Sequence, residues 1–371
     1  MRIALRELRR RPGRFAVAAV ILTLIALLLM FLGGLLDGLL ASSTGAYRAQ
    51  EADLVVYSED AQDTLLRSRI TPELRDQVAA VDGVTAVGGL GTVQLGGRLG
   101  DEPDGDDLLA TALLGYELAP RGLPEEPPAP GTVVADSSLE ADGVEEGTTL
   151  LLGPARTPVE VVGFVDDTRY SGQGSLWGSL DTWREVTRAN RPGEATGDGI
   201  VQALVVRTDG DPGAVASAID EATDGATDTL TLSAAIEALP GVSQQRSTFN
   251  QIIGVTVVIA VVVVALFFAL ITVERTALYG ILKAVGASGA TLFGGVVTQA
   301  VVVTLLAAGV GAAAALALDA VIPPGSIPFA ATPGRLLSSV ALLLAAAVLG
   351  SAFSLRRVLR IDPASAIGTA G

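Results

Sequence analysis

The apolar residues of this chain are concentrated in four long runs that contain no charged residue. Each run has 20 residues or more, and a helix of that length rises about 30 Å, the thickness of the hydrocarbon core of a membrane. The buried helices of soluble proteins rarely have so many consecutive apolar residues. Two runs are rich in valine, but a chain inside lipid must satisfy its own backbone hydrogen bonds and therefore forms a helix. The predicted transmembrane helices are residues 15–36, 252–273, 292–318 and 336–355.

Between the first two runs, residues 37–251 show short apolar stretches that alternate with turn residues, which predicts an α+β domain. Thr71 followed by Pro72 and Glu73 is typical of the first turn of a helix. The fold class is therefore an integral membrane protein with four transmembrane α-helices and a large α+β extracytoplasmic domain inserted between helices one and two. The predicted strands are 54–57, 84–95 (interrupted by three glycines), 108–116, 132–135, 149–152, 159–165 and 200–207, and the predicted helices are 71–80, 137–142, 181–188 and 212–223.

Basic residues orient the predicted helices, because the segments beside a membrane that carry arginine and lysine stay in the cytoplasm. Six arginines precede the first run and three follow the last one. The first run is too long for the apolar region of a cleaved signal peptide, which has about 7–15 residues. We expect a multi-pass protein of the cell membrane with both termini in the cytoplasm. Segments 1–14, 274–291 and 356–371 are predicted to be cytoplasmic, and segments 37–251 and 319–335 to lie outside.

Charge is divided along the chain in the same way. Residues 37–250 contain 36 acidic residues and 13 arginines, whereas the rest of the chain contains 4 acidic and 12 basic residues. A basic cytoplasmic side suits the anionic inner leaflet of a membrane. We therefore expect the lipid bilayer as a partner. The acidic external domain would repel the phosphate groups of a nucleic acid, so we expect no nucleic acid as a partner.

Several kinds of chemistry are excluded because cysteine and histidine are both absent. Disulfides, Cys/His zinc sites, thiol nucleophiles and imidazole acid–base catalysis all need these residues. The only lysine, Lys283, is followed by Ala284, so the chain lacks the Gly-Lys-Ser/Thr of a phosphate-binding loop. We therefore predict that the chain is not an enzyme and has no catalytic residue, metal site or bound cofactor. The neighbouring carboxylates Asp166 and Asp167 are interpreted as a solvated turn.

Glycines mark two places where helices can approach each other closely. Gly34 and Gly38 are four residues apart at the outer end of the first predicted transmembrane helix, and Gly309 and Gly311 lie within the third. Small residues at this spacing allow close packing of transmembrane helices. The pattern leaves open whether they pack within one chain or between two chains.

The segment 274–291, between the second and third runs, has apolar residues at helical spacing. Such an amphipathic helix lies on a membrane surface or binds in the groove of a partner. Gly286 is a typical helix end, and Ser288 is a typical start for the next helix. Both interpretations, surface anchor and docking helix, remain open. The apolar positions are Ala277, Leu278, Ile281, Leu282 and Val285.

Three segments, in this order, resemble the MacB/FtsX-like permeases of ABC transporters. They are residues 131–170 within the external domain, ERTALYGILKAVGAS at 274–288, and RRVLRIDPASAI at 356–367. The starting sequence LRELRRRPGRF and residues 52–70 are similar to a subgroup that includes haem-exporter and heterocyst-exporter permeases. In the first segment the matching positions are Val133, Val134, Ser137, Leu139, Gly143, Val144, Gly147 and 161–165.

The resemblance implies that a separate ATP-binding subunit binds ATP and magnesium and hydrolyses ATP. It also implies that two permeases pair, as a homodimer or with a homologous permease. The implied coupling residues are Glu274, Arg275, Ala277, Leu278, Ile281, Leu282, Val285 and Gly286. A second contact with the ATP-binding subunit is implied at Arg360, Asp362 and Pro363, where a plain stop signal after the last helix is the alternative.

The expected function is export of a hydrophobic or amphipathic substrate, with movement transmitted from the cytoplasmic side to the external domain. The apolar runs contain no charged residue, which argues against a channel for a polar solute. Two alternatives are an FtsX-type signal transmitter that controls external partners such as cell-wall hydrolases, and the extraction of lipids or lipoproteins. If the substrate is haem, Tyr47 and Tyr57 are candidate ligands, although Tyr47 also suits an interfacial anchor.

Overall fold

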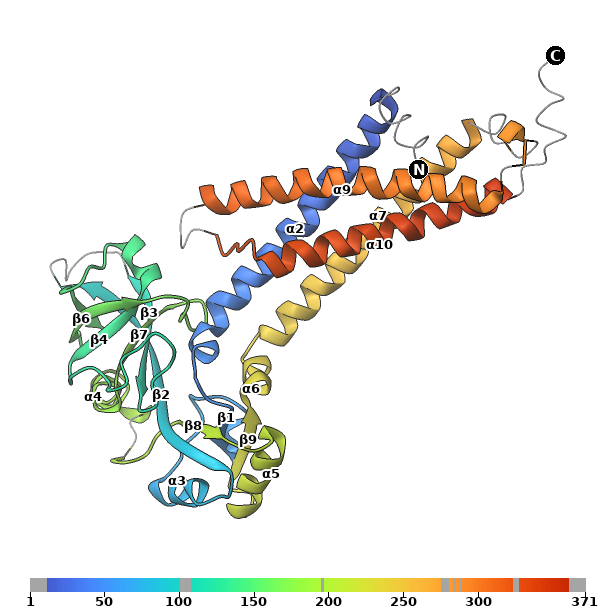
Figure 1. Cartoon of the computed structure of the whole chain (residues 1–371). Helices are drawn as coiled ribbons and strands as arrows, with labels where there is room; N and C mark the ends of the chain where they lie inside the picture. The colour runs from blue at the N-terminus through green and yellow to red at the C-terminus, as the bar shows by residue number, and fades with distance from the viewer. Residues whose placement is uncertain are drawn as a thin grey trace. The chain divides into compact units, whose positions relative to one another are not determined.

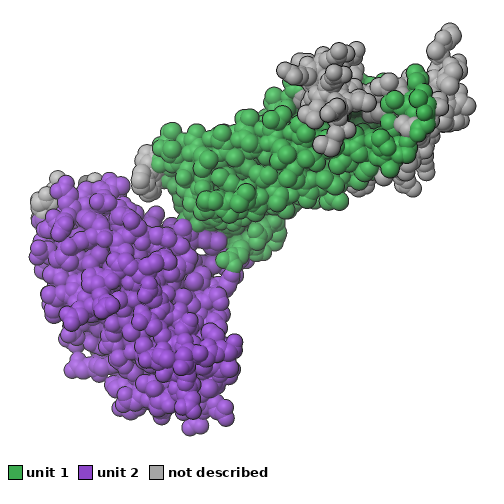
Figure 2. All heavy atoms as spheres, in the orientation of Figure 1, with its two compact units in different colours: residues 1–38, 246–371 green, residues 39–245 purple. Residues whose placement is uncertain are grey.

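The computed structural model describes residues 12–100, 108–194, 197–274, 280–282, 285–286, 288–322 and 327–359. By its internal contacts the chain divides into two compact units, which Figure 2 distinguishes by colour. Residues 1–38 and 246–371 form the first, here called the helical unit, and residues 39–245 form the second, the sheet unit.

Among the described residues, four helices are long and apolar enough to cross a membrane. The first precedes the sheet unit and the other three follow it, which confirms the predicted fold class (Figure 1). Each helix extends beyond its uncharged run, because polar residues continue the helical backbone at the ends. The four helices are α2 (Pro12–Arg48), α7 (Val242–Glu274), α9 (Gly289–Val321) and α10 (Pro333–Leu359).

Small residues bring the helices of the helical unit together. A Cβ atom added to Gly311 in α9 would lie 2.9 Å from the Cβ atom of Ala26 in α2, and one added to Gly350 in α10 would lie 2.7 Å from the carbonyl oxygen of Val261. A Cβ atom added to Gly309 would have no neighbour within 4 Å. Gly311 therefore packs within the chain, whereas Gly309 has open space where a side chain would lie.

The sheet unit contains nine strands in the order β3-β7-β4-β6-β5-β2-β8-β1-β9. An additional pairing of β3 with β2 closes the first six of these strands into a ring. Strand β2 also belongs to an open part, which continues with β8, β1 and β9. The strands are β1 (Leu54–Ser58), β2 (Val84–Leu99), β3 (Leu109–Tyr116), β4 (Thr132–Asp136), β5 (Thr149–Leu152), β6 (Thr157–Val165), β7 (Gly174–Ser179), β8 (Ala203–Thr208) and β9 (Thr227–Thr231).

The long strand β2 corrects the prediction of short strands interrupted by glycine. It runs through 16 residues, pairs with β8 near its start, and pairs with β3 and β5 further along. Its glycines make room for neighbouring side chains: a Cβ atom on Gly91 would lie 2.6 Å from the indole ring of Trp183. A residue without a side chain allows this approach without ending the strand.

Four α-helices accompany the strands. Helix α3 begins after Thr71, whose hydroxyl accepts a hydrogen bond from the N–H of Leu74 at 3.4 Å, as the sequence predicts. Residues 137–142, predicted to be helical, form a 3-10 helix. Strands β7 and β9 and helix α6 have no counterpart in the prediction. The helices are α3 (Pro72–Ala79), α4 (Leu180–Asn190), α5 (Pro212–Ala222) and α6 (Leu232–Ala238), and short 3-10 helices also cover 59–61 and 192–194.

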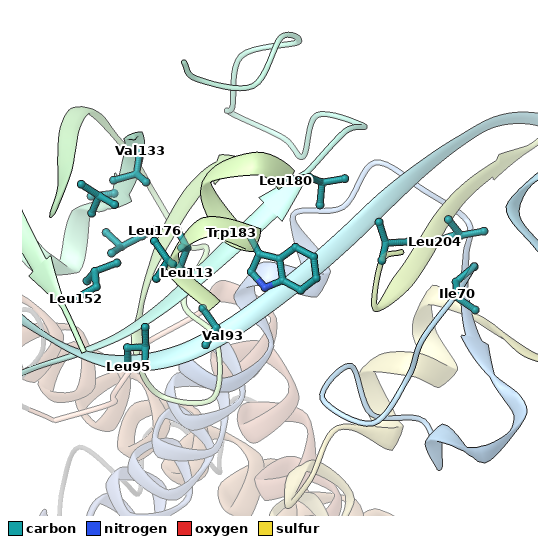
Figure 3. Close-up of a cluster of buried hydrophobic side chains, with 14 of the residues drawn as sticks. Ile70, Val93, Leu95, Leu113, Val133, Leu152, Leu176, Leu180, Trp183 and Leu204 are labelled. Carbon is teal, nitrogen blue, oxygen red and sulfur yellow. The ribbon is translucent and has the colours of Figure 1, made fainter. Parts of the chain in front are cut away.

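The sheet unit has two apolar cores. In the larger one, Trp183 of α4 lies beside Val93 of β2 (Figure 3). The other core contains Trp177 of β7 and Tyr116 of β3, whose rings meet edge to face with centroids 6.0 Å apart. Burial of large side chains such as these is the main favourable contribution to folding.

Candidate functional site

The described part of the predicted coupling segment leaves apolar side chains uncovered. Helix α7 ends at Glu274, and residues 280–282 are helical. The side chain of Ile281 is 54% exposed and that of Val285 is 82% exposed, so the chain itself does not bury them. Gly286 has a φ of +103°, and Ser288 forms the N-cap of α9 by accepting a hydrogen bond from the N–H of Thr291 at 3.2 Å.

Other predicted coupling residues lie outside the described residues. These are Arg275, Ala277 and Leu278 in the segment 274–291, and Arg360, Asp362 and Pro363, which follow Leu359 in the sequence. Their roles stay predictions.

Tyr47 and Tyr57, the candidate haem ligands, lie in the interior of the sheet unit. Their side chains are 1% and 0% exposed, and their hydroxyl oxygens are 2.8 Å apart, in hydrogen-bond contact. The ring of Tyr170 stacks on that of Tyr47, with centroids 6.1 Å apart. Burial raises the pKa of Tyr57 and raises that of Tyr170 to about 12. An axial ligand must reach the iron as an accessible phenolate, so the two residues fit neither a haem site nor an interfacial anchor.

No metal site is apparent in the described residues. They contain no group of three or more Asp and Glu side chains placed to hold a metal ion. Asp63 and Asp228 do lie close together, and partial burial together with the charge of Asp63 raises the pKa of Asp228. Two carboxylates without further ligands leave the coordination of a divalent ion incomplete.

In the helical unit, an ion pair joins α2 to the start of α10. The Nε of Arg335 donates to Oδ2 of Asp37 at 3.1 Å, and the hydroxyl of Thr332 donates to the same oxygen at 2.9 Å. The two charged side chains are only 25% and 21% exposed. The same Thr332 hydroxyl accepts from the N–H of Arg335 at 3.3 Å in the first turn of α10. Asp37 thus contacts both Arg335, its ion-pair partner, and Thr332, the residue before the helix.

The loop before α10 rests directly on the glycines of α2. A Cβ atom on Gly34 would clash with the ring of Phe329, and one on Gly38 would clash with the carbonyl group of Pro328. The N–H of Ala330 donates to the carbonyl oxygen of Gly34 at 3.0 Å, and the ring of Phe329 stacks on that of Phe31. Gly34 and Gly38 therefore pack within the chain, against a loop and not against another helix.

In the sheet unit, the end of α2 contacts Asp167, which lies beside Asp166 in an exposed bend, as the sequence predicts. The guanidinium of Arg48 donates to Oδ2 and Oδ1 of Asp167 at 2.9 and 2.6 Å. Arg48 and Asp167 are 119 positions apart in the sequence, so neither residue type nor spacing predicts that they form an ion pair. The next residue upstream, Asp166, accepts a hydrogen bond from Ser137.

Comparison with known proteins gives a family match and two relatives, one aligned over the full chain and one over part of it. Residues 250–363 match the model of the FtsX-like permease C-terminal family. A putative hemin transport system permease protein HrtB from Staphylococcus haemolyticus is 20% identical over 99% of this chain and 99% of its own length. The protein of the same name from Staphylococcus epidermidis is 25% identical over 30% of this chain and 31% of its own length.

Two solved structures also resemble the chain, at low similarity. The periplasmic region of MacB from Actinobacillus actinomycetemcomitans covers 50% of this chain and 92% of its own, with a TM-score of 0.34 and 10% identity. The extracellular domain of the ABC-type transporter YknZ from Gram-positive bacteria covers 48% and 100%, with a TM-score of 0.33 and 12% identity.

The family match covers α9, most of α7 and all of the described part of α10, with the intervening segment that carries Ile281 and Val285. The hemin permease relative aligns from end to end, sheet unit included. Such permeases are transporter subunits and not catalytic enzymes, and they work in a membrane with an ATP-binding partner. Residues 250–363 thus form an FtsX-like permease domain, and the chain along its whole length is similar to a putative hemin transport system permease protein.

Proposed function

We propose that this permease couples ATP hydrolysis by its separate ATP-binding subunit to the export of a hydrophobic or amphipathic substrate. Hemin is the first candidate, because both relatives are named as putative hemin transport permeases. The uncharged runs of the transmembrane helices support an apolar route over a polar one. We propose that two permeases pair, either as a homodimer or with a homologue.

One observation carries this proposal. Helices α2 and α7 each run without a break from the helical unit into the sheet unit. A helix resists sharp bending wherever its backbone hydrogen bonds are kept, because kinks need a proline, a π-bulge or an inserted group. Movement of the helices on the cytoplasmic side can therefore reach the external domain, without passage of the substrate through a polar channel.

The coupling contact is proposed at residues 274–288, on the cytoplasmic side with both chain termini. The exposure of Ile281 and Val285 supports a contact, because apolar side chains that remain uncovered mark interaction surfaces. The amphipathic helix that the sequence predicts here would fit a groove on a partner. Arg360, Asp362 and Pro363 are proposed as a second contact.

The test is a reconstitution of the permease with its ATP-binding subunit in proteoliposomes. We expect hemin to stimulate ATP turnover and to be removed from the membrane in an ATP-dependent manner. Replacing Ile281 and Leu282 by Asp should abolish both effects and co-purification of the partner, since each buried aliphatic side chain contributes about 1.5–3 kcal/mol. Val162→Asp, at a 41% exposed position of β6, is the control and should bind normally.

Two outcomes would contradict the proposal. If neither hemin nor other amphipathic compounds change ATP turnover, while the complex assembles, the permease is not such an exporter, and signal transmission and the extraction of lipids or lipoproteins are the alternatives. If the Ile281 and Leu282 double variant keeps the partner, residues 281 and 282 face lipid and coupling runs through another segment.

A further inference from the structure

The last turns of α2 hold a second stretch of backbone, residues 167–173, here called the joint segment. The N–H of Ala46 donates to the carbonyl oxygen of Arg169 at 3.0 Å. The N–H groups of Ser171 and Gly172 donate to the carbonyl oxygens of Ser43 and Ser42 at 3.1 and 2.9 Å. All three bonds join the backbone of residues 42–46 to the joint segment, so the joint segment is attached directly to the main chain of α2.

Gly45 allows this contact. A Cβ atom on Gly45 would lie 2.7 Å from the nitrogen of Arg169 and 2.8 Å from the carbonyl oxygen of Asp167. Both neighbours are backbone atoms, which cannot rotate away as the end of a flexible side chain can. Any larger residue at position 45 must therefore push the joint segment away from the helix.

Arg48 adds a directional contact one turn further along. Its two hydrogen bonds to Asp167 have the paired geometry of a guanidinium with a carboxylate, and its Nε donates to the hydroxyl of Thr44 at 3.1 Å. The side chains of Arg48 and Asp167 are 35% and 49% exposed. At that exposure an ion pair contributes little stability, so its effect is to fix the orientation of the joint segment on α2.

The other face of the joint segment is bound to the strand ring. Asp136, at the end of β4 and 2% exposed, accepts hydrogen bonds from the N–H and the hydroxyl of Thr168, both at 2.8 Å. The Thr168 hydroxyl also lies 2.8 Å from that of Ser175 in β7. A buried carboxylate with several donors holds its partners tightly, because leaving it unpaired is costly. The joint segment is thus fixed to α2 on one side and to β4 and β7 on the other.

The covalent connections of the two membrane helices lead elsewhere. After α2 the chain enters β1, and before α7 it leaves β9 through α6. Strands β1 and β9 pair with each other in the open part of the sheet. The main chain therefore ties both helices to the open part, whereas the joint segment ties α2 to the ring.

We propose that the joint segment makes the ring follow α2, so that a shift of α2 relative to α7 tilts the ring against the open part about their common strand β2. Gly45, Arg48 and Asp167 are its positioning residues. This inference rests on the proposed transmission of movement through α2 and α7.

The test measures one distance in the full complex with the ATP-binding subunit in lipid nanodiscs. Because the chain has no cysteine, spin labels can be placed selectively at Glu160→Cys in β6 of the ring and Glu221→Cys in α5, which packs on β9. The distance between the labels is compared in nucleotide-free and vanadate-trapped complexes. We expect the distance to change on trapping in the parent protein, and the change to fall by at least half in Gly45→Ala and in Arg48→Ala. Bound ATP-binding subunit and basal ATP turnover should stay unchanged.

The matched control is Gly254→Ala, at a helix glycine of α7 with no neighbour within 4 Å; it should keep the full distance change. Arg48→Lys, which keeps the charge but not the paired geometry, should lie between Arg48→Ala and the parent. If Gly45→Ala does not fold, the Arg48 variants decide. A full distance change in the folded joint variants overturns the inference and leaves the proposed function intact. No distance change in the parent protein overturns the proposed transmission itself.

Discussion

The ion pair between Asp37 and Arg335 permits a quantitative test of how the helical unit is held together. We consider Asp37→Asn, Arg335→Gln and the double variant. Asparagine keeps a carbonyl oxygen that can accept from the hydroxyl of Thr332, and glutamine keeps polar atoms near the same place. Each single change therefore removes the charge interaction and disturbs few other contacts, as a double-mutant cycle requires.

The expected magnitude follows from the geometry and the burial of the pair. Two unit charges about 4 Å apart attract each other by about 4 kcal/mol at an effective dielectric constant near 20, and desolvation offsets part of this attraction. Exposed pairs contribute about 0.2–1 kcal/mol. Because the side chains of Asp37 and Arg335 are 21% and 25% exposed, we expect a coupling free energy of about 1–2 kcal/mol, between the exposed and the buried cases.

Unfolding of the detergent-solubilised permease by titration with sodium dodecyl sulfate measures these free energies. The same cycle on Arg188 and Asp198, which are 3.8 Å apart with side chains 61% and 102% exposed, is the control and should give a coupling near zero. If the cycle on Asp37 and Arg335 gives no more than the control, the pair does not fasten α2 to α10, and the packing of the loop on Gly38 must do so.

Three further predictions concern topology, packing and pH. In intact cells, an impermeant thiol reagent should label Glu140→Cys from outside and leave Lys283→Cys unlabelled; labelling of the latter would reverse the proposed orientation. Gly311→Ala should lower the unfolding free energy by about 1–2 kcal/mol because an added methyl group overpacks the helix contact, whereas Gly309→Ala should raise it slightly through helix propensity; equal melting temperatures would contradict this packing. Since the pKa of Asp228 is raised on folding, its ionisation opposes folding, so Asp228→Asn should melt higher than the parent protein at pH 7, with the difference vanishing below the ordinary aspartate pKa of about 3.9.

The features that the sequence predicts correctly are those determined by local pattern. Four uncharged runs can only be helices in lipid, so the order of the membrane helices around the inserted domain follows from composition alone. The first turn of α3 is equally local, because Thr71 and Pro72 supply the hydrogen-bond acceptor and the fixed φ angle within three residues. No distant contact is needed for either prediction.

The features that the sequence does not predict depend on residues far apart in the chain. The glycines of β2 suggest breaks, and only the position of Trp183 shows that they make room for an indole ring. Similarly, the sequence predicts the exposed bend at Asp166 and Asp167 but not the ion pair of Asp167 with the distant Arg48. Tyr47 and Tyr57 suggest a ligand or an anchor because sequence pattern does not reveal that their hydroxyl groups face each other in a core.

The contacts of α2 with the helical unit and with the sheet unit can be related to the length of this helix. Its 37 residues span about 55 Å at 1.5 Å per residue, well beyond the roughly 30 Å of a hydrocarbon core. A helix needs no such extension to anchor a domain, because a flexible linker would serve. The extension is useful if the helix transmits movement. For that, each part of the helix must be attached to the unit in which it lies. Asp37 and Gly38 provide contacts within the helical unit, and Gly45 and Arg48 provide contacts within the sheet unit. These contacts on both parts of α2 are what the proposed transmission of movement would use.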